Sequence, residues 1–144
     1  MWEQDRVLLQ SLSCFRQKTK NKEKRIKTYN FKNLNIWRFS IELTDEIYIL
    51  TDSFPKSEEF GLKSQIRRCS VSVASNIAEG SSRSSNKDFN RFLEISLGSL
   101  YELQTQIIIS SNRNYFDLSK LENIENKITE LQKMISGFQK NLKL

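Results

Sequence analysis

The 144-residue sequence contains no histidine, and this absence removes several classes of catalytic site. A Ser-His-Asp triad needs an imidazole as its general base. The di-iron site that some helical bundles carry needs a Glu-x-x-His motif, and many zinc sites use histidine ligands. The two cysteines, Cys14 and Cys69, are too few and too far apart for a cysteine-rich zinc site. We therefore expect no metal site of these kinds.

Glycine is also scarce, and the four glycines are scattered at Gly61, Gly80, Gly98 and Gly137. No glycine-rich phosphate-binding loop is present. Carboxylate pairs such as Asp45 with Glu46 and Glu58 with Glu59 are sequence neighbours, which do not face each other on a helix. Cys69 lies on an apolar helical stripe, where packing is the expected role rather than nucleophilic attack. We expect a protein that is not an enzyme and that uses no cofactor.

Long apolar runs are missing too, since none approaches the roughly 18 residues of a membrane-spanning helix. The first residues include Glu3 and Asp5, where a secretion signal would be basic. Two cysteines do not make a disulfide framework, which suits a reducing compartment. These features predict a cytoplasmic protein without a membrane partner.

The formal net charge of +6 is unevenly distributed. Residues 1–32 hold nine Lys or Arg against three Asp or Glu, whereas residues 33–144 hold fourteen of each kind. We therefore divide the chain into a basic N-terminal extension, residues 1–32, and a balanced domain, residues 33–144. The basic run KTKNKEKRIK of the extension is interpreted as an arm for phosphate backbones or acidic partners, as a solvated leader, or as the product of an upstream start codon.

The domain has the apolar periodicity of four helices, so we predict an all-α, up-down-up-down antiparallel four-helix bundle. The first helix, about residues 33–52, carries two adjoining apolar stripes: Leu34, Trp37, Ile41, Thr44 and Tyr48, and Ile36, Leu43, Ile47 and Leu50. So wide an apolar face favours a subunit interface beside the core, although a wide core in a monomer explains it as well. In the following turn we expect Phe54 and Phe60 to close the end of the bundle.

The second helix, about residues 62–79, has the stripe Leu62, Ile66, Cys69, Val73 and Ile77 beside many small residues. Gly80 is expected to end it in the left-handed conformation. Ser85 and Asp88 then form a start resembling a capping box for the third helix, about residues 86–111. Gly98 in that helix is expected to allow close approach to the small residues of the second helix.

The fourth helix is expected to start at Asp117 or Ser119, with Glu122 completing a capping box on Ser119. Its core-facing residues repeat at alternating spacings of three and four, which is typical of an antiparallel bundle: Leu121, Ile124, Ile128, Leu131, Ile135, Phe138 and Leu142.

The segment QIRRCSVSVASNIAEG, followed by KDFNRFLEISLGSLYELQTQ, resembles the bacterial 23S rRNA intervening-sequence proteins. The shared positions include Gln65, Arg67, Arg68, Asn76, Glu79, Gly80 and Gly98. This resemblance implies a homo-oligomer that closes as a pentamer, and association with RNA or DNA. The related accessory protein of diversity-generating retroelements adds a possible protein partner, a reverse transcriptase. The alternative is a protein-binding scaffold without nucleic-acid binding of its own.

Basic residues of the domain form a candidate binding site. We expect Arg68, Arg83, Lys87 and Arg91 to contact phosphate around the corner between the second and third helices, and the alternative is a solvated helix start. Arg67 is expected to face an acid instead, since adjacent residues point about 100° apart around a helix. Gln65, Arg67, Asn76, Glu79, Gly80 and Gly98 are assigned structural roles.

Overall fold

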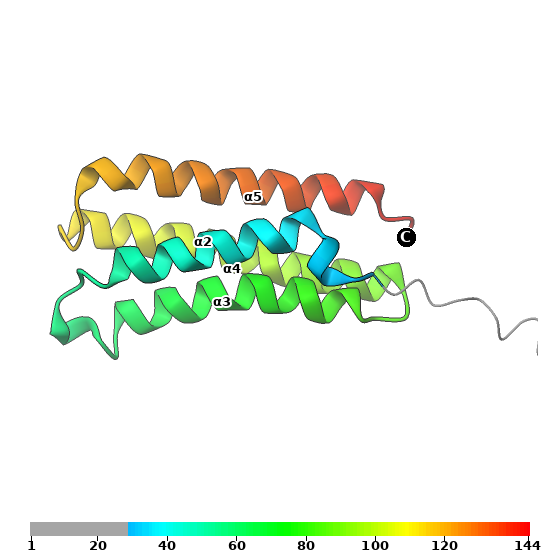
Figure 1. Ribbon diagram of the computed structural model, residues 1–144, viewed down its shortest axis with the longest axis horizontal. Helices are drawn as coiled ribbons and strands as arrows, with labels where there is room; N and C mark the ends of the chain where they lie inside the picture. Colours follow the sequence, from blue (N-terminus) through cyan, green and yellow to red (C-terminus); the bar gives the residue numbers. More distant parts are fainter. Residues whose placement is uncertain (1–28) are drawn as a thin grey trace, which may run out of the picture.

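The computed structural model describes residues 29–144. They form four long helices, α2 (Asn35–Thr51), α3 (Leu62–Ser81), α4 (Asn86–Asn112) and α5 (Leu121–Asn141). Three short 3-10 turns, η1 (Phe31–Asn33), η2 (Lys56–Glu58) and η3 (Leu118–Lys120), precede α2, α3 and α5. The helices lie side by side and alternate in direction, with no strand among these residues (Figure 1). The predicted all-α four-helix bundle is confirmed, while most of the predicted basic extension, residues 1–28, lies outside the described residues.

The core is built from the predicted apolar stripes, one from each helix. α2 buries its second stripe and leaves part of the first, including Ile41 and Tyr48, half exposed. The other three helices contribute fully buried side chains at their predicted positions: Ile66, Val73 and Ile77 of α3; Phe89, Leu93, Leu100, Leu103 and Ile107 of α4; and Ile128, Leu131 and Ile135 of α5. Removing this apolar surface from water is the main force that closes the bundle.

Small residues bring α3 and α4 close together, as their spacing predicts. The Ser96 hydroxyl donates to the backbone oxygen of Val73 at 3.0 Å, and the hydroxyls of Ser72 and Ser99 lie 3.1 Å apart. The Cys69 thiol donates to the backbone oxygen of Ser99 at 2.9 Å. These bonds satisfy polar groups inside a tight helix pair.

Gly80 does not end α3, contrary to the prediction. No glycine among the described residues has a positive φ, and the helix continues to Ser81 with Ser82 as its C-cap. Gly80 is buried where α4 crosses it, and an added Cβ would lie 2.6 Å from Cβ of Phe92 and 2.7 Å from Cδ2 of Phe89. The glycine is therefore needed for close helix packing and not for a turn.

Gly98 was expected to provide such a close approach, and that expectation is wrong within the chain. Gly98 is exposed on the outer surface of α4, and an added Cβ would meet nothing within 4 Å. The neighbouring serines, Ser96 and Ser99, make the contacts to α3 instead.

The helix starts are partly as predicted. The Ser85 hydroxyl accepts from the backbone N–H of Asp88 at 3.1 Å and so caps α4. Asp117 caps η3 by accepting from the backbone N–H of Ser119 at 3.0 Å. The expected capping box between Ser119 and Glu122 does not form, because Ser119 lies within η3 and α5 begins only at Leu121. The N-terminus of α5 has no side-chain cap.

Aromatic packing fixes where the chain enters the bundle. The Tyr29 ring lies 5.3 Å from that of Phe89 and 6.0 Å from that of Phe138, and the Phe31 ring lies 5.0 Å from that of Trp37. The described chain therefore begins at the end of the bundle where α3 ends and α4 starts (Figure 1). In residues 29–144, no helix combines the length and the apolar character needed to cross a membrane.

Candidate nucleic-acid interface

Arg67 faces an acid, as predicted, but the acid is one that the sequence pattern did not single out. Its Nη2 donates to Oδ1 of Asp52 at 2.8 Å, and its Nε donates to Oγ1 of Thr51 at 2.9 Å. The guanidinium also lies 4.4 Å from the centre of the Tyr48 ring. Arg67 thus connects α3 to the C-terminal end of α2.

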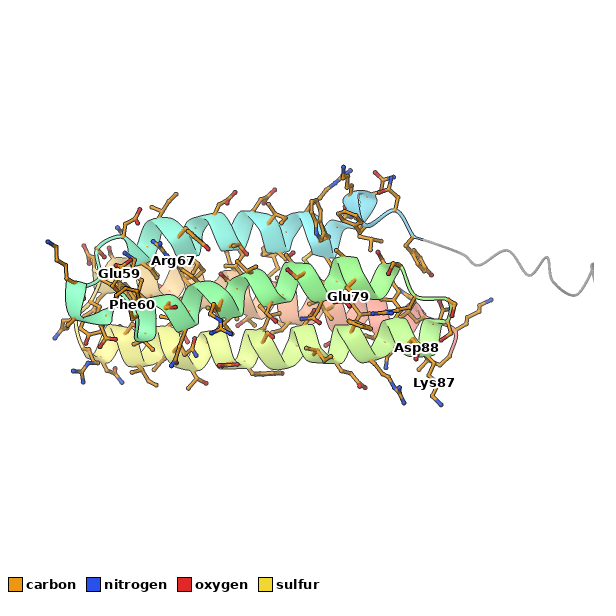
Figure 2. All side chains as sticks on the ribbon, turned by 90° about the horizontal axis from the view of Figure 1, so that it is seen from below. Glu59, Phe60, Arg67, Glu79, Lys87 and Asp88 are labelled. Atoms are coloured by element: carbon orange, nitrogen blue, oxygen red, sulfur yellow. The ribbon has the colours of Figure 1, made fainter. Side chains whose placement is uncertain are left out.

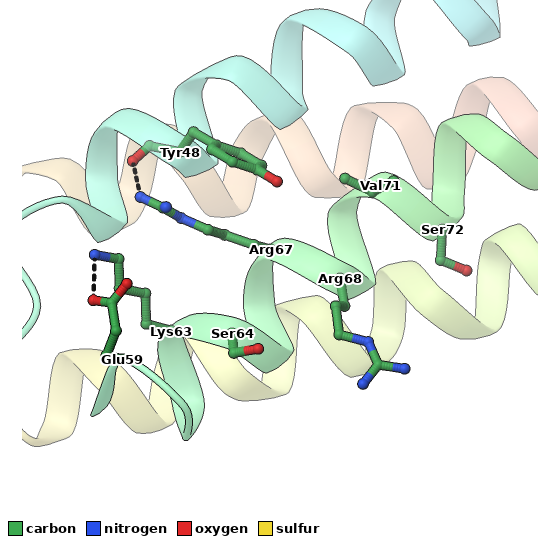
Figure 3. Close-up of a pocket in the computed structure, with 8 residues that line it drawn as sticks. All are labelled: Tyr48, Glu59, Lys63, Ser64, Arg67, Arg68, Val71 and Ser72. Carbon is green, nitrogen blue, oxygen red and sulfur yellow. Dashed lines mark hydrogen bonds and ion pairs between the residues drawn. The ribbon is translucent and has the colours of Figure 1, made fainter. Parts of the chain in front are cut away.

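Arg68 points to solvent and makes no hydrogen bond or ion pair with the rest of residues 29–144. It lies in the first half of α3, fifteen positions before Arg83, which corresponds to roughly 20 Å along the helix axis. The structure therefore does not bring Arg68 to the corner between α3 and α4. Figure 3 shows its side chain directed away from Arg67 and Tyr48.

The other three predicted residues do meet at that corner. Nη2 of Arg83 lies 2.8 Å from Oε1 of Glu79, and its guanidinium covers the ring of Phe92 at 4.6 Å. Nη1 of Arg91 lies 3.9 Å from Oδ1 of Asp88, a loose ion pair. Lys87 is exposed and has no acidic partner within the described chain. Figure 2 shows Lys87, Asp88 and Glu79 together at this end of the bundle.

Two cations from the far end of the sequence join this corner, and the sequence analysis missed them. The Asn86 side-chain amide donates to the backbone oxygen of Lys143 at 2.9 Å, and the Gln139 amide donates to Oδ1 of Asn90 at 3.0 Å. These bonds hold the end of α5 against the start of α4, so that Lys140 and Lys143 lie at the same end of the bundle. Lys140 and Lys143 reach this corner because α5 is long enough to return to the start of α4. Apolar periodicity alone does not predict the relative lengths of the two helices.

The charge of the bundle is polarised along its long axis. We call residues 29–43, 72–98 and 131–144 the basic end, and residues 44–71 and 99–130 the acidic end. The basic end holds four acids, Glu42, Glu79, Asp88 and Glu94, against eight cations, Lys32, Arg38, Arg83, Lys87, Arg91, Lys133, Lys140 and Lys143. The acidic end holds seven cations, Lys56, Lys63, Arg67, Arg68, Arg113, Lys120 and Lys127, against ten acids, Asp45, Glu46, Asp52, Glu58, Glu59, Glu102, Asp117, Glu122, Glu125 and Glu130.

The balanced charge of residues 33–144 therefore conceals a net of +3 at one end and −3 at the other, and Lys32 adds one more positive charge to the basic end. Residues 1–28 carry eight Lys or Arg against three Asp or Glu. They are joined to Tyr29, whose ring packs on Phe89 and Phe138 at the basic end. The basic segment of the sequence is thus joined to the described chain at the basic end of the bundle.

The remaining residues singled out in the sequence have local contacts. Nδ2 of Asn76 donates to the backbone oxygen of Ser72 at 2.8 Å, and Glu79 pairs with Arg83, which agrees with their structural interpretation. Gln65 lines a surface groove of about 310 Å³ whose other residues are Arg68, Cys69, Ser72, Ser99 and Glu102.

Cys69 is buried beside that groove. Burial, followed by the nearby Glu102 carboxylate, raises the pKa of its thiol to about 12. A thiol of this kind is a poor nucleophile near neutral pH. Within the described part of the chain, no three His, Cys, Asp or Glu side chains form a group that could hold a metal ion.

Comparison with known proteins agrees with this architecture. A solved structure from Bacteroides thetaiotaomicron, described as a protein of unknown function from the S23 ribosomal protein family, superimposes with a TM-score of 0.68. The two chains are 26% identical, and the match covers 74% of this chain and 99% of the other. No curated protein matches the chain. The sequence model of the 23S rRNA-intervening sequence protein family matches residues 32–137, most of the sequence, and the chain therefore belongs to this family.

Proposed function

We propose that this chain is a non-enzymatic module that binds RNA or DNA as a homo-oligomeric ring, with the basic end of each bundle turned toward the phosphate backbone. The observation that carries the proposal is the polarisation of charge: eight cations against four acids at the basic end, next to the attachment point of a basic segment. Its family resemblance to proteins encoded within ribosomal RNA genes supports the same class of partner.

The chemistry of the basic end suits a non-specific phosphate contact. Lys87, Lys140 and Lys143 are exposed and have no acidic partner among residues 29–144. Side chains of this kind gain affinity mainly by releasing counterions from the nucleic acid. Arg83 and Arg91 are already paired with Glu79 and Asp88, so they contribute through exposed guanidinium groups that a phosphate can share.

Assembly strengthens a weak site of this kind. A ring presents the same corner several times, and each further contact becomes intramolecular once the first has formed. The half-exposed side chains of Ile41 and Tyr48 on α2 supply apolar surface for subunit contacts. Light scattering after gel filtration tests this part, since a monomer at micromolar concentration would refute the ring and a dimer would refute the pentamer.

The experiment on binding uses Arg83→Ala/Lys87→Ala/Arg91→Ala in the full chain and in residues 29–144, which contain the whole described core. Fluorescence anisotropy gives the affinity for a labelled 30-nucleotide RNA and for its DNA equivalent at several salt concentrations. Each lost phosphate contact lowers the slope of log K against log salt by about 0.7–0.9, so we expect a decrease of about 2 to 3.

The matched control is Lys56→Ala compared with Lys87→Ala. Both lysines are exposed and free of ion pairs within the described chain, but Lys56 lies at the acidic end. We expect Lys87→Ala to lower the slope by about one phosphate contact and Lys56→Ala to leave it unchanged. Equal affinities and slopes for the triple variant and the parent would show that the corner is only a solvated helix start. Binding by none of the proteins would favour the scaffold function.

A further inference from the structure

Two aromatic rings lie together where the described chain enters the basic end. The Phe31 ring lies 5.0 Å from the Trp37 ring, in an edge-to-face arrangement. Trp37 packs against the hydrophobic core, whereas Phe31 is half-buried and, within the described chain, neither belongs to the core nor packs against it. Because the two rings do not stack on each other, a ring face stays free of the partner ring. We call Phe31 and Trp37 the entry pair.

The turn that carries Phe31 is held in place by side-chain hydrogen bonds. Oδ1 of Asn30 accepts from the backbone N–H of Lys32 at 3.2 Å and so caps η1. Nε of Arg38, on α2, donates to the backbone oxygen of Lys32 at 2.8 Å, and Nη2 donates to Oδ1 of Asn33 at 3.5 Å. The ring is therefore presented by a preorganised turn, which reduces the entropy that a ligand loses in ordering its site.

Two cations flank the entry pair. Lys32 and Arg38 are both exposed, and neither forms an ion pair with an acid among residues 29–144. Nη1 of Arg38 makes no hydrogen bond within this part of the chain and can donate to a ligand. Charged residues are depleted from the cores of protein interfaces, and lysine is among the least favoured there. An aromatic face between two uncompensated cations instead matches a ligand that combines a planar ring with negative charge.

We infer that the entry pair is a stacking platform for an unpaired base of single-stranded nucleic acid, whose adjoining phosphates contact Lys32 and Arg38. This inference rests on the proposed function and names the class of nucleic acid that the basic end prefers. Proteins that bind single strands combine a positively charged surface with aromatic side chains on which bases stack. The bases of a duplex are already stacked on one another, so a duplex can use the cations but not the ring.

The entry pair and the corner cations belong to the same end of the bundle. η1 contacts α3 as well as α2, and it lies toward the end where α3 turns into α4 (Figure 1). A flexible single strand can therefore contact the entry pair and also reach the phosphate-binding lysines of the corner. The two contacts differ in their physical signature, because phosphate contacts depend on salt through counterion release and stacking does not.

Trp37 makes the stacking measurable. The sequence has two tryptophans, so Trp2→Phe in the full chain leaves Trp37 as the only one. A base stacked on Phe31 lies close enough to Trp37 to quench its fluorescence. This protein is titrated with an unstructured 30-nucleotide RNA, with DNA of the same sequence, and with the corresponding DNA duplex. We expect the single strands to quench Trp37 and the duplex to leave its emission nearly unchanged at saturation; quenching by only one of the two single strands would identify which sugar the site accepts.

A substitution at Phe31 separates stacking from charge. Phe31→Leu in the same background removes the ring face and keeps an apolar side chain. We expect it to weaken single-strand binding by about 5- to 100-fold without a change in the salt slope, because stacking releases no counterions. Its affinity for the duplex should not change. Lys32→Ala should act in the opposite way, since it lowers the slope for the single strand by about 0.7 and preserves the quenching at saturation.

The matched control is Phe60→Leu, which changes an exposed ring at the acidic end. Phe60 was expected to close that end together with Phe54, but only Phe54 is buried, with its ring 5.4 Å from that of Tyr115 and 6.3 Å from that of Phe116. These rings fill the end of the bundle, and Phe60, on the turn before α3, is left 97% exposed. Phe60→Leu should bind single strands as the parent does.

The outcomes separate this inference from the proposed function. A parent that binds neither single strands nor duplex would refute both. Equal affinity for single strands and duplex, without quenching of Trp37, would leave the phosphate contact standing and overturn the stacking platform. Unchanged single-strand affinity in Phe31→Leu would overturn it as well. A smaller mass of Phe31→Leu in light scattering would place Phe31 in a subunit contact, which contradicts the platform in the same way.

Discussion

The guanidinium of Arg67 on α3 and the carboxylate of Asp52 at the end of α2 form an ion pair with an Nη2–Oδ1 distance of 2.8 Å. The same guanidinium donates to the hydroxyl of Thr51, which is fully buried, and to the backbone oxygen of Tyr48 at 3.1 Å. The Arg67 side chain of α3 therefore donates a hydrogen bond to a backbone carbonyl near the C-terminal end of α2. Its role is to fasten the first helix hairpin, which explains why it does not join the other cations.

We predict that Arg67→Ala lowers the free energy of unfolding by about 1.5–3 kcal/mol, because it removes hydrogen bonds from a charged donor and the packing of its stem on Tyr48. Arg91→Ala is the matched control, since Arg91 is exposed and only 3.9 Å from its acid. Its effect should stay within about 0.5 kcal/mol. Urea denaturation at one fixed protein concentration measures both. Equal losses for the two variants would contradict the assigned role.

The two helix-interior glycines should respond to alanine in opposite directions. At Gly80 the new Cβ would lie 2.6 Å from Cβ of Phe92, so Gly80→Ala must push α3 and α4 apart and should cost about 1–3 kcal/mol. At Gly98 nothing lies within 4 Å, and Gly98→Ala should stabilise the helix by up to about 1 kcal/mol. Thermal unfolding of both variants tests the pair, and a stabilised Gly80→Ala would refute the close packing.

The sequence predicts the helices well because their information is local. The spacing of Ile66, Val73 and Ile77 places them on one stripe, and all three are fully buried. Ser85 caps α4 as its position relative to Asp88 predicts. Such features depend on a few neighbouring residues and the geometry of a single helix.

What the sequence does not predict depends on which elements meet. The local sequence around a glycine near a helix end is the same whether the glycine adopts a left-handed conformation or makes room for a side chain of another helix. At Gly80 the reason is the second, because Phe92 of α4 packs directly against it. The acid that pairs with Arg67 lies fifteen residues earlier in the chain. Lys143 reaches the start of α4 only because α5 is long enough to return there. Of the cations at the corner between α3 and α4, the sequence analysis named Arg83, Lys87 and Arg91. It did not name Lys140 and Lys143, which the return of α5 brings to the same end.

Acid should destabilise the turn before α3. The backbone N–H of Leu62, followed by the hydroxyl of Tyr115, lowers the pKa of Glu58 below its ordinary value of 4.5. A folded-state pKa below the unfolded value means that the stabilisation is present above pH 4.5 and is lost as the pH falls through the folded pKa. The backbone N–H of Ser119 lowers the pKa of Asp117 in the same direction.

We therefore predict that Glu58→Gln reduces stability near pH 7 and makes the melting temperature less sensitive to pH below about 5. Glu130→Gln, which changes an exposed carboxylate without a hydrogen bond in the described chain, serves as the control. Melting curves from pH 3 to pH 7 compare the two variants with the parent. Parallel curves for Glu58→Gln and the parent would show that Glu58 does not contribute to the acid response.

Cys69 should be protected from thiol reagents in the folded protein. Its pKa is raised from 9.0 to about 12, mainly by burial, so the thiolate fraction at pH 8 falls by about three orders of magnitude. We predict that Cys14→Ser, which leaves Cys69 as the only cysteine, reacts with a disulfide reagent at least about 100-fold more slowly in buffer than in 6 M guanidinium chloride. The double variant Cys14→Ser/Cys69→Ala gives the background rate. Equal rates in buffer and denaturant would mean that the Cys69 thiol is open to solvent, and that its hydrogen bond to Ser99 does not hold in solution.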